Sequence, residues 1–326
     1  MQTSNDISKV EVLLATYNGA RYLREQIDSI LGQDYANLVV LAWDDGSTDG
    51  TQAILEEYAM RFPGRVQVCA GGEATGHPKL NFLRLMQAST AEYVCFADQD
   101  DVWLPHKVSL TMAAMRRMET RYGAQAPLLV FTDLRVVDER LQTLHRSFWQ
   151  RAGLRAENIH RLERVLGDNV VTGCTAMMNR SLCTLATQMP AEAEMHDRWV
   201  GLLAAALGAA EPIAEQTVLY RQHGRNVVGS KQADASLSGL VSRSQHDDGR
   251  RAERLKSEHQ VRALLRLHGA QLSPERRSVL EAYLRSGESD SAWSRVGITL
   301  RYGFYRSGLL RSGATIVDLW RARSTD

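Results

Sequence analysis

Two patterns of apolar and polar positions alternate through the first half of the chain. Residues 10–15 form a nearly unbroken apolar run, which is typical of a strand covered on both faces of a sheet. Segments with apolar residues three and four positions apart follow such runs, as along one side of a helix. The pattern predicts strands at 10–15, 38–43, 66–70 and 93–97, and later strands at 128–132, 174–178 and 217–220.

Strand, helix, strand in this order predicts an α/β fold with a mostly parallel sheet flanked by helices, because right-handed crossovers place helices on the sheet faces. We expect this part to extend over residues 1–228. Residues 229–250 are rich in Ser, Gln and Asp without apolar periodicity, so we expect a linker or mobile loop there. Residues 251–326 are helical in pattern and rich in arginine.

The composition is that of an ordinary globular protein, with 44% hydrophobic and 24% charged residues. A net charge of +1 argues against a general nucleic-acid binder, because phosphate binding requires a clear basic excess. The four cysteines form no Cys-x-x-Cys pair, which favours reduced thiols in an intracellular protein. Without a signal peptide or a spanning stretch, we expect a cytoplasmic protein, at most peripheral to the inner face of the membrane.

Acidic residues follow the predicted strands at the edge where ligands bind in an open parallel sheet. The segment 44–49 (Asp-Asp-Gly-Ser-Thr-Asp) follows the second strand, and 98–101 (Asp-Gln-Asp-Asp) follows the fourth. For 44–49 alone, a simple turn with a helix cap is an equal alternative. The carboxylates of 98–101 would repel one another unless a cation or a donor-rich ligand lay between them. Mg²⁺ is held in this way by carboxylates and substrate phosphates.

Together these motifs resemble those of glycosyltransferase family 2, whose catalytic domain has the GT-A fold. The resemblance covers roughly residues 9–230 and follows the family's order of motifs. Residues 14–19 (Leu-Ala-Thr-Tyr-Asn-Gly) are similar to its first nucleotide-contacting turn, and 44–49 to its second. Residues 96–103 (Phe-Ala-Asp-Gln-Asp-Asp-Val-Trp) resemble its Asp-x-Asp motif, in the form that bacterial rhamnosyltransferases of surface polysaccharides carry.

The resemblance implies roles for individual residues. Asp100 and His223 are the implied ligands of Mg²⁺ or Mn²⁺, with a structural role as the alternative for His223. The family's third motif is a Gly...Asn pair, which Gly76 and Asn81 match. Family members usually have an Arg directly before this Asn, where this chain has Leu80, and Lys79 is the candidate to replace its charge. The residues implied in binding the donor nucleotide are Thr16, Tyr17, Asn18, Asp44, Asp45, Lys79, Asn81 and Asp98.

The segment 195–199 (Met-His-Asp-Arg-Trp) opens a predicted helix and resembles the family's catalytic-base segment. The resemblance makes Asp197 the general base, and a simple helix cap is the alternative. A helix N-terminus favours the ionised carboxylate that a base requires. The residues expected near the donor sugar or the acceptor are Gly173, Cys174, His196 and Trp199.

A single base and a metal-held diphosphate predict direct displacement with inversion at the anomeric carbon. By resemblance, the donor is dTDP-L-rhamnose and the acceptor is a hydroxyl of a growing surface polysaccharide, carried as a glycan or glycolipid. The processive Gln-x-x-Arg-Trp motif is absent from the sequence, which favours one sugar per encounter. The alternatives are a haloacid-dehalogenase-type phosphatase with Asp98 as nucleophile, and a nucleotide-sugar-binding module that has lost catalysis.

The C-terminal region lies outside the resemblance. Residues 251–326 carry 14 Lys and Arg against 8 Asp and Glu, interleaved with aromatic residues. Basic amphipathic helices with aromatic residues can lie on anionic membranes, which would suit a lipid-linked acceptor. A helical cap docked on the catalytic domain, or a face of a homodimer, is the alternative.

Overall fold

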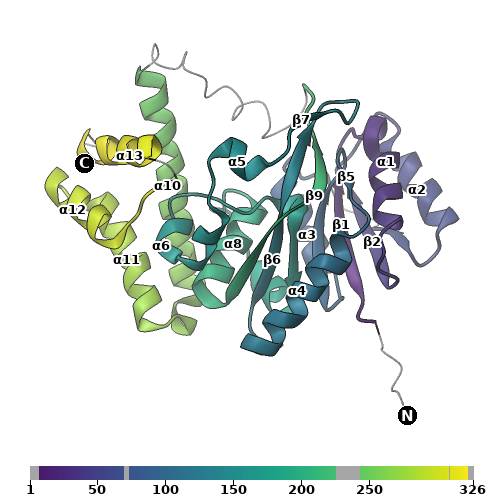
Figure 1. The fold of residues 1–326 in the computed structure, drawn as a ribbon, viewed down its shortest axis with the longest axis horizontal. Helices are drawn as coiled ribbons and strands as arrows, with labels where there is room; N and C mark the ends of the chain where they lie inside the picture. The colour runs from purple at the N-terminus through teal and green to yellow at the C-terminus, as the bar shows by residue number, and fades with distance from the viewer. Residues whose placement is uncertain (1–6, 70–72, 225–242, 308, 322–326) are drawn as a thin grey trace.

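The computed structural model describes residues 7–69, 73–224, 243–307 and 309–321. Within these ranges the centre is a nine-stranded sheet with the order β3-β2-β1-β4-β8-β6-β9-β5, and β7 pairs with β6 (Figure 1). The strands are β1 (Val10–Thr16), β2 (Leu38–Asp44), β3 (Val66–Val68), β4 (Tyr93–Asp98), β5 (Val102–Trp103), β6 (Leu128–Val137), β7 (Thr143–His145), β8 (Ala176–Asn179) and β9 (Ala209–Arg221).

The predicted parallel arrangement is confirmed for the first four strands, where β3, β2, β1 and β4 all pair in parallel. The sheet beyond β4 is mixed, because β8 runs antiparallel between β4 and β6. Strand β9 pairs in parallel with β6 and is much longer than the predicted strand at 217–220. Cys174 precedes β8, in the short 3₁₀ helix η2 (Gly173–Thr175), instead of opening the strand.

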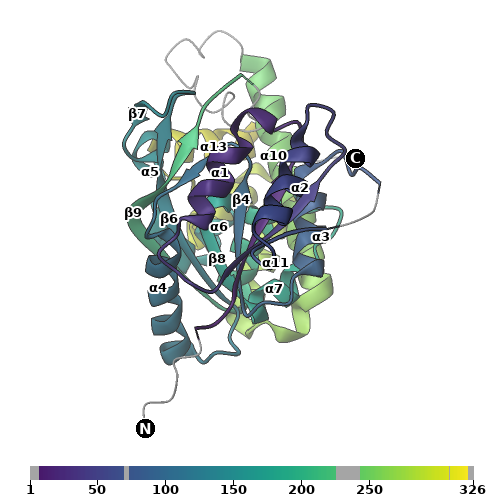
Figure 2. The ribbon, with the colours of Figure 1, turned by 90° about the vertical axis from the view of Figure 1, so that its right-hand side faces the viewer.

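Helices cover both faces of the sheet, as the unbroken apolar run of β1 requires. Val12 and Leu14 face the helices α1 (Ala20–Leu31), α2 (Thr51–Arg61) and α4 (Lys107–Tyr122). Leu13, between them, faces the opposite side, where α3 (Pro78–Ala88), α7 (Arg180–Ala186) and α8 (His196–Leu207) pack. Successive residues of a strand point to opposite faces, so this one run serves two layers. Helices α1 and α2 lie side by side at the β2 end of the sheet (Figure 2).

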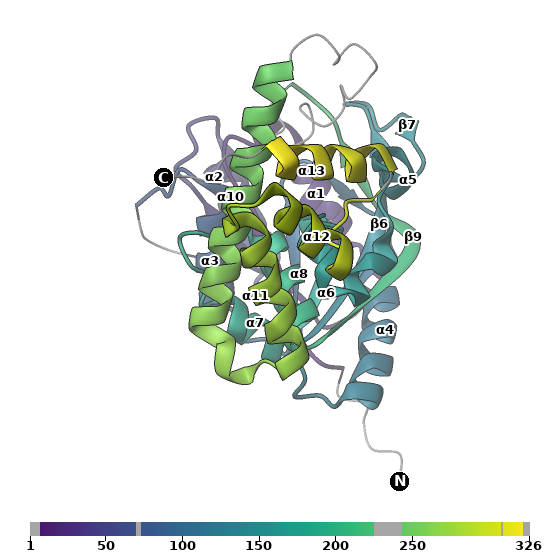
Figure 3. The ribbon, with the colours of Figure 1, turned by 90° about the vertical axis from the view of Figure 1, so that its left-hand side faces the viewer.

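The C-terminal helices dock on the α8 side of the molecule (Figure 3). Val261, Leu264 and Leu280 are fully buried and belong to the same hydrophobic cluster as Phe96 of β4. The helical part and the sheet therefore share one core. The C-terminal helices are α10 (Arg243–His268), α11 (Pro274–Glu288), α12 (Ala292–Tyr302) and α13 (Leu309–Arg321), and the short η4 (Gly269–Gln271) follows α10. Three short helices come earlier in the chain, namely α5 (Phe148–Ala152), η1 (Ala156–His160) and α6 (Leu162–Val165).

Two expectations about the second half of the chain concern the linker at 229–250 and the absence of a membrane-spanning helix. Residues 243–250, expected in a linker, are instead the first turns of α10, and residues 229–242 lie outside the described ranges. Along the described part of the chain, no helix combines the length and the apolar character needed to cross a membrane.

Candidate active site

The ends of β1, β2 and β4 open into one cleft of about 2180 Å³. Its other walls come from η2, the start of α8, the segment after β9, and α10. The sequence-predicted residues that line it are Thr16, Tyr17, Asn18, Asp45, Asn81, Asp98, Asp100, Gly173, His196, Asp197 and His223. The structure therefore brings the acidic residues and the candidate base into one cleft, although Asp45 and Asp197 lie more than a hundred positions apart in the chain. Asp44, Lys79, Cys174 and Trp199 do not line this cleft.

The turns after β1 and β2 are fastened to each other. The Thr16 hydroxyl donates to Asp44 Oδ1 over 2.9 Å, and the Ser47 backbone N–H donates to Asp44 Oδ2 over 2.9 Å. The backbone N–H of Asn18, a residue with a positive φ of 48°, donates to Ser47 Oγ over 2.8 Å. The Asp44 carboxylate is thus engaged in holding the two turns together, and Thr16 and Asn18 form the cleft surface beside it.

Asp45 connects the end of β2 to the segment before α3. Its carboxylate accepts the backbone N–H groups of Thr75, over 2.5 Å, and Gly76, over 2.9 Å. The Thr75 hydroxyl in turn donates to Asn81 Oδ1 over 2.7 Å. Lys79 points elsewhere: its ammonium donates to the carbonyl oxygens of residues 191 and 193, over 2.8 and 2.7 Å. The lysine expected to replace the family's arginine therefore fixes the loop before α8.

The acidic turn after β4 is held by two glutamines that the sequence reasoning did not select. The Gln99 amide accepts from the Tyr17 backbone N–H over 2.8 Å and donates to the Tyr17 carbonyl over 2.9 Å. Gln26 donates to the Asp98 carbonyl over 2.8 Å. A Cβ on Gly19 would come within 2.2 Å of Gln99 Oε1, so a side chain there would displace the Gln99 amide that joins the two turns. The only sequence signal for Gln99 was its place inside the Asp-x-Asp motif.

Asp98, Asp100 and His223 form the acidic centre of the cleft. The His223 Nε2 atom lies 2.7 Å from Asp100 Oδ2. Burial, and after it the neighbouring charges of Asp100 and Asp197, together raise the pKa of Asp98 to about 7. Two carboxylates and an imidazole facing one cavity suit a divalent cation, which would relieve the repulsion that the raised pKa reflects. The predicted ligands Asp100 and His223 are therefore chemically suited to Mg²⁺ or Mn²⁺.

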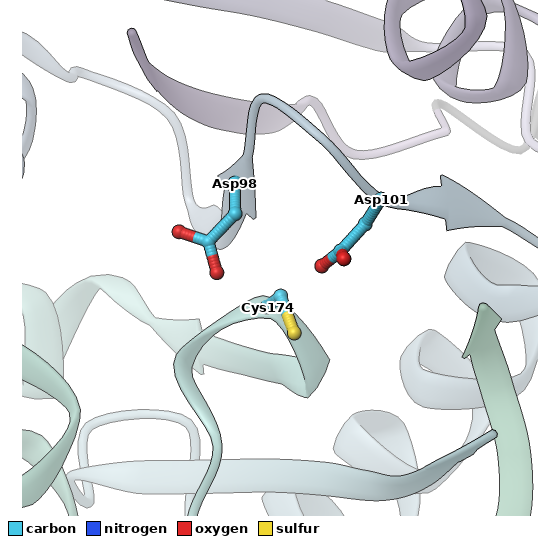
Figure 4. Close-up of side chains that lie close together, drawn as sticks. All are labelled: Asp98, Asp101 and Cys174. Atoms are coloured by element: carbon cyan, nitrogen blue, oxygen red, sulfur yellow. The ribbon is translucent and has the colours of Figure 1, made fainter. Parts of the chain in front are cut away.

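Asp101 and Cys174 are buried side chains that lie close to Asp98 (Figure 4). Ligand atoms of Asp98, Asp101 and Cys174 lie within 4.8 Å of one another. Burial raises the pKa of the Cys174 thiol, as do the carboxylates of Asp101 and Asp98. A thiol that stays protonated is a poor metal ligand, and thiolates select softer metals than Mg²⁺ or Mn²⁺. We therefore interpret Asp101 and Cys174 as support for the acidic turn. The Cys174 side chain, expected near the sugar, is buried and does not line the cleft.

Arg221, at the end of β9, fixes the acidic turn from the other side. It is almost fully buried, and its guanidinium donates to the Asp100 carbonyl over 2.8 Å and to Glu25 Oε2 over 2.6 Å. Its backbone N–H donates to Asp101 Oδ1 over 3.1 Å. Arg221 lies two positions before His223, but the sequence alone does not distinguish a buried arginine from an exposed one.

The candidate base Asp197 lies in the first turn of α8. Burial raises the pKa of Asp197 to about 6, although the backbone N–H groups of Arg198 and Gly173, the Arg198 charge and the Asn169 side chain act in the opposite direction. The expected lowering effect of the helix N-terminus is therefore outweighed by burial. Asp197 is nevertheless ionised at neutral pH, as a base must be. Trp199, two positions later and expected near the sugar, is fully buried in the core and does not line the cleft.

The family model described as glycosyl transferase family 2 matches residues 11–184, which is more than half of the chain. The chain belongs to glycosyl transferase family 2. Among curated family relatives, a dTDP-rhamnosyl transferase of Shigella flexneri is 36% identical over 98 residues, which are 29% of this chain and 34% of that protein. A putative teichuronic acid biosynthesis glycosyltransferase of Bacillus subtilis is 26% identical over 243 residues, or 72% of this chain and 87% of that protein. The matches to the first three relatives span 34%, 30% and 49% of their lengths.

Solved structures confirm the GT-A fold expected of family 2. The structure of S. aureus TarS residues 1–349 in complex with UDP has a TM-score of 0.52 at 16% identity, over 91% of this chain and 92% of that one. A mannosyltransferase from Pyrobaculum calidifontis, in complex with GDP-Man and Mn²⁺, has a TM-score of 0.51 at 18% identity, over 96% and 79%. The phosphatase alternative is wrong, because the family is one of glycosyltransferases and Asp98 ends the fourth strand along the chain.

Proposed function

We propose that this family 2 member is an inverting, metal-dependent, non-processive transferase that moves L-rhamnose from dTDP-L-rhamnose to a hydroxyl of a growing surface polysaccharide. The observation that best supports this is the shared cleft of Asp98, Asp100 and Asp197. The charge of Asp197 contributes to the raised pKa of Asp98, so base and acidic centre lie within electrostatic reach of each other. A donor sugar between them would expose one face to the base and the other to its diphosphate.

The donor side of the cleft suits a nucleotide diphosphate. Thr16, Asn18 and Asp45 line it and are held by the interlocked turns. Asp100 and His223 would hold Mg²⁺ or Mn²⁺, which supplies positive charge against the charge that develops on the departing diphosphate. The mannosyltransferase complex with GDP-Man and Mn²⁺ supports a cation in such a site.

Asp197 would accept the proton of the attacking acceptor hydroxyl. General-base catalysis is most effective when the pKa of the base lies near the working pH, and burial places the pKa of Asp197 at about 6. In this proposal no second carboxylate serves as a nucleophile, so attack is direct and the anomeric configuration inverts. The Shigella flexneri relative supports rhamnose as the sugar.

The C-terminal helices offer a surface for a lipid-linked acceptor. Trp293 and Trp320 are 76% and 45% exposed, and their rings contact each other at 4.5 Å. Tryptophans beside basic residues are favoured at a membrane interface, which supports a cytoplasmic enzyme bound peripherally to the inner face of the membrane. A homodimer stays a prediction.

A thermal-shift panel tests donor and cation together. Melting temperatures would be measured with dTDP-L-rhamnose, UDP-GlcNAc and GDP-mannose, each with and without Mg²⁺ or Mn²⁺. We expect dTDP-L-rhamnose to raise the melting temperature most, and only with the cation. A stronger shift with another sugar nucleotide would overturn the donor, and an undiminished shift in EDTA would overturn the cation.

Asp197→Asn separates catalysis from binding. The variant should bind the donor as the wild type does and lose at least about a hundredfold in transfer rate, which is a typical contribution of a general base. Retained transfer would remove Asp197 from the role of base. If the wild type itself bound the donor with Mn²⁺ but never transferred or hydrolysed the sugar, the inactive binding module would be the better description.

A further inference from the structure

The helix end that carries Asp197 lacks the usual cap. Met195 occupies the N-cap position of α8, and its side chain makes no capping hydrogen bond. The Asp197 carboxylate itself accepts the Arg198 backbone N–H over 2.7 Å, but a helix end without an N-cap side chain is prone to fray. A base must nevertheless be held to within a fraction of an ångström of its working position. Other contacts must therefore fix the first turn of α8.

His196, the first residue of α8, is packed like a core residue. Its ring stacks on Phe82 with the centroids 3.9 Å apart, and it meets the edge of Phe96 at 4.7 Å. The side chain is only 4% exposed, and neither ring nitrogen has a hydrogen-bond partner within the described part of the chain. Burial lowers the pKa of His196 to about 3, so the ring is neutral. Its contacts are therefore those of a flat, uncharged spacer.

Gly173 closes the other side of this slot. A Cβ on Gly173 would lie 2.7 Å from His196 Nε2 and 3.5 Å from the Asp197 Cβ, and the first distance is too short for any side chain. The backbone N–H of Gly173 also acts on the Asp197 carboxyl, whose pKa it works to lower. The slot between Phe82 and Gly173 thus has room for an imidazole but little more. On its outer side, Gln260 of α10 accepts the backbone N–H of Glu194 over 3.1 Å.

We propose that His196 is the positioning residue of Asp197, a neutral wedge between Phe82 and Gly173 that sets the depth of the first turn of α8 in the cleft. The inference rests on the proposed role of Asp197 as the base. It assigns packing to His196, and no hydrogen bond to donor or acceptor. Gly173 is its partner, because the glycine gives both the room for the ring and the N–H for the carboxylate.

Four proteins test the wedge: wild type, His196→Ala, Gly173→Ala and the double variant. Each alanine should lower kcat about tenfold or more with the donor KM little changed, because the base is displaced while the nucleotide side is intact. In the double variant the added methyl group enters the space that the ring has left. Its kcat should therefore exceed that of Gly173→Ala, and a purely additive loss would overturn the proposal.

His196→Leu distinguishes packing from hydrogen bonding. Leucine has nearly the volume of the imidazole but no nitrogen, so His196→Leu should recover part of the kcat that His196→Ala loses, although its shape is not that of the flat ring. A loss as large as that of His196→Ala would show that a ring nitrogen contacts the reactants, which contradicts the wedge.

Urea unfolding of the same four proteins gives a readout that does not depend on the donor. If the proposed donor is wrong, even the wild type will not turn over dTDP-L-rhamnose, but the stabilities of the Gly173 and His196 variants should still be non-additive. Additive stabilities would overturn the wedge whatever the donor is.

Discussion

Single residues in the cleft owe their chemistry to burial more than to their partners. Asp98, Asp101 and Asp197 all have raised pKa values, and burial is the first cause for each. The protein thus keeps carboxylates in places from which water is largely excluded and where the ionised form is destabilised. Such an arrangement is useful only if a cation or a reacting proton makes use of that charge.

The pKa of Asp197 predicts an acid limit of the transfer reaction. The base must be ionised, so kcat at saturating donor and cation should fall about tenfold per pH unit below about 6 and be flat above it. Saturating cation keeps the acidic centre ionised across this range. A rate profile between pH 5 and 8 measures it. An acid limb that remained near pH 4 would mean that Asp197 is more solvated than its surroundings indicate.

The same burial predicts that Asp197→Asn is more stable than the wild type at neutral pH. The folded-state pKa lies near 6, above the ordinary 3.8, so the wild type loses stability as the pH rises through this window. The asparagine has no charge to bury, and we expect a gain of about 1–3 kcal/mol at pH 7.5. Urea unfolding at pH 7.5 and at pH 4 checks this, because the gain should disappear at the lower pH. An equal gain at both values would point to packing instead of charge.

At the scale of elements, the site depends on turns that are joined to other turns. Asp45 joins β2 to the segment before α3, Gln99 joins β4 to β1, and Arg221 joins β9 to β4. No single loop therefore carries the donor side of the cleft. The strands hold the turns at fixed distances, and hydrogen bonds between neighbouring turns fix their orientation.

Gly208, between α8 and β9, is a sharp test of such close approach. A Cβ there would lie 1.8 Å from the Pro127 carbonyl oxygen, at the point where β9 begins to pair with β6. Backbone would have to move, so Gly208→Ala should lower the free energy of unfolding by about 1–3 kcal/mol. Gly297→Ala, inside α12 with no atom within 4 Å of the new Cβ, is the matched control and should stabilise by about 0.4–1 kcal/mol. Urea unfolding of both variants measures the two changes in the free energy of unfolding. Equal changes would contradict the close approach of Gly208 to the Pro127 carbonyl.

The first strands and the placement of the acidic turns could be predicted because their signals are local. The run at 10–15 and the acidic segment at 98–101 each fall within a few positions, and the family resemblance ordered them. The antiparallel entry of β8 could not be predicted, because an apolar run does not by itself give the direction of its strand, and the segments η1, α6 and η2 before β8 are too short to form a regular crossover helix. Burial of Trp199 and of Arg221 was equally invisible, since both occur in polar motifs that also have exposed members.

On the scale of the whole molecule, the C-terminal helices contribute to the cleft that holds the candidate site. Glu253 of α10 and Arg306 line the cleft together with Asp168. Arg306 lies 3.3 Å from Asp168 and 3.2 Å from Glu253, and the backbone N–H of Ser307 donates to Asp168. Helices α10 and α11 therefore pack on the rest of the molecule, as the cap alternative for residues 251–326 expected. This packing does not conflict with a membrane-facing role for the exposed tryptophans of α12 and α13.

The shared core predicts that residues 1–228 do not fold well alone. Without Val261, Leu264 and Leu280, the α8 side of the core would be open to water, so the fragment should aggregate or unfold at much lower urea than the full chain. The full chain should unfold in one transition. Size-exclusion chromatography and urea unfolding measure both. Co-expression with residues 243–326 is the control and should restore solubility, whereas a fragment as stable as the full chain would show two independent cores.

The position of β8 has a consequence for how the enzyme is made. Strands β1 to β4 lie within residues 10–98 and pair with one another, so the donor-side turns can assemble while the rest is still being translated. Strand β8 and the helix that bears Asp197 emerge from the ribosome later. Strand β4 is the unpaired edge of the sheet until β8 pairs with it. A nascent chain would therefore complete the turns after β1, β2 and β4 before it gains the candidate base.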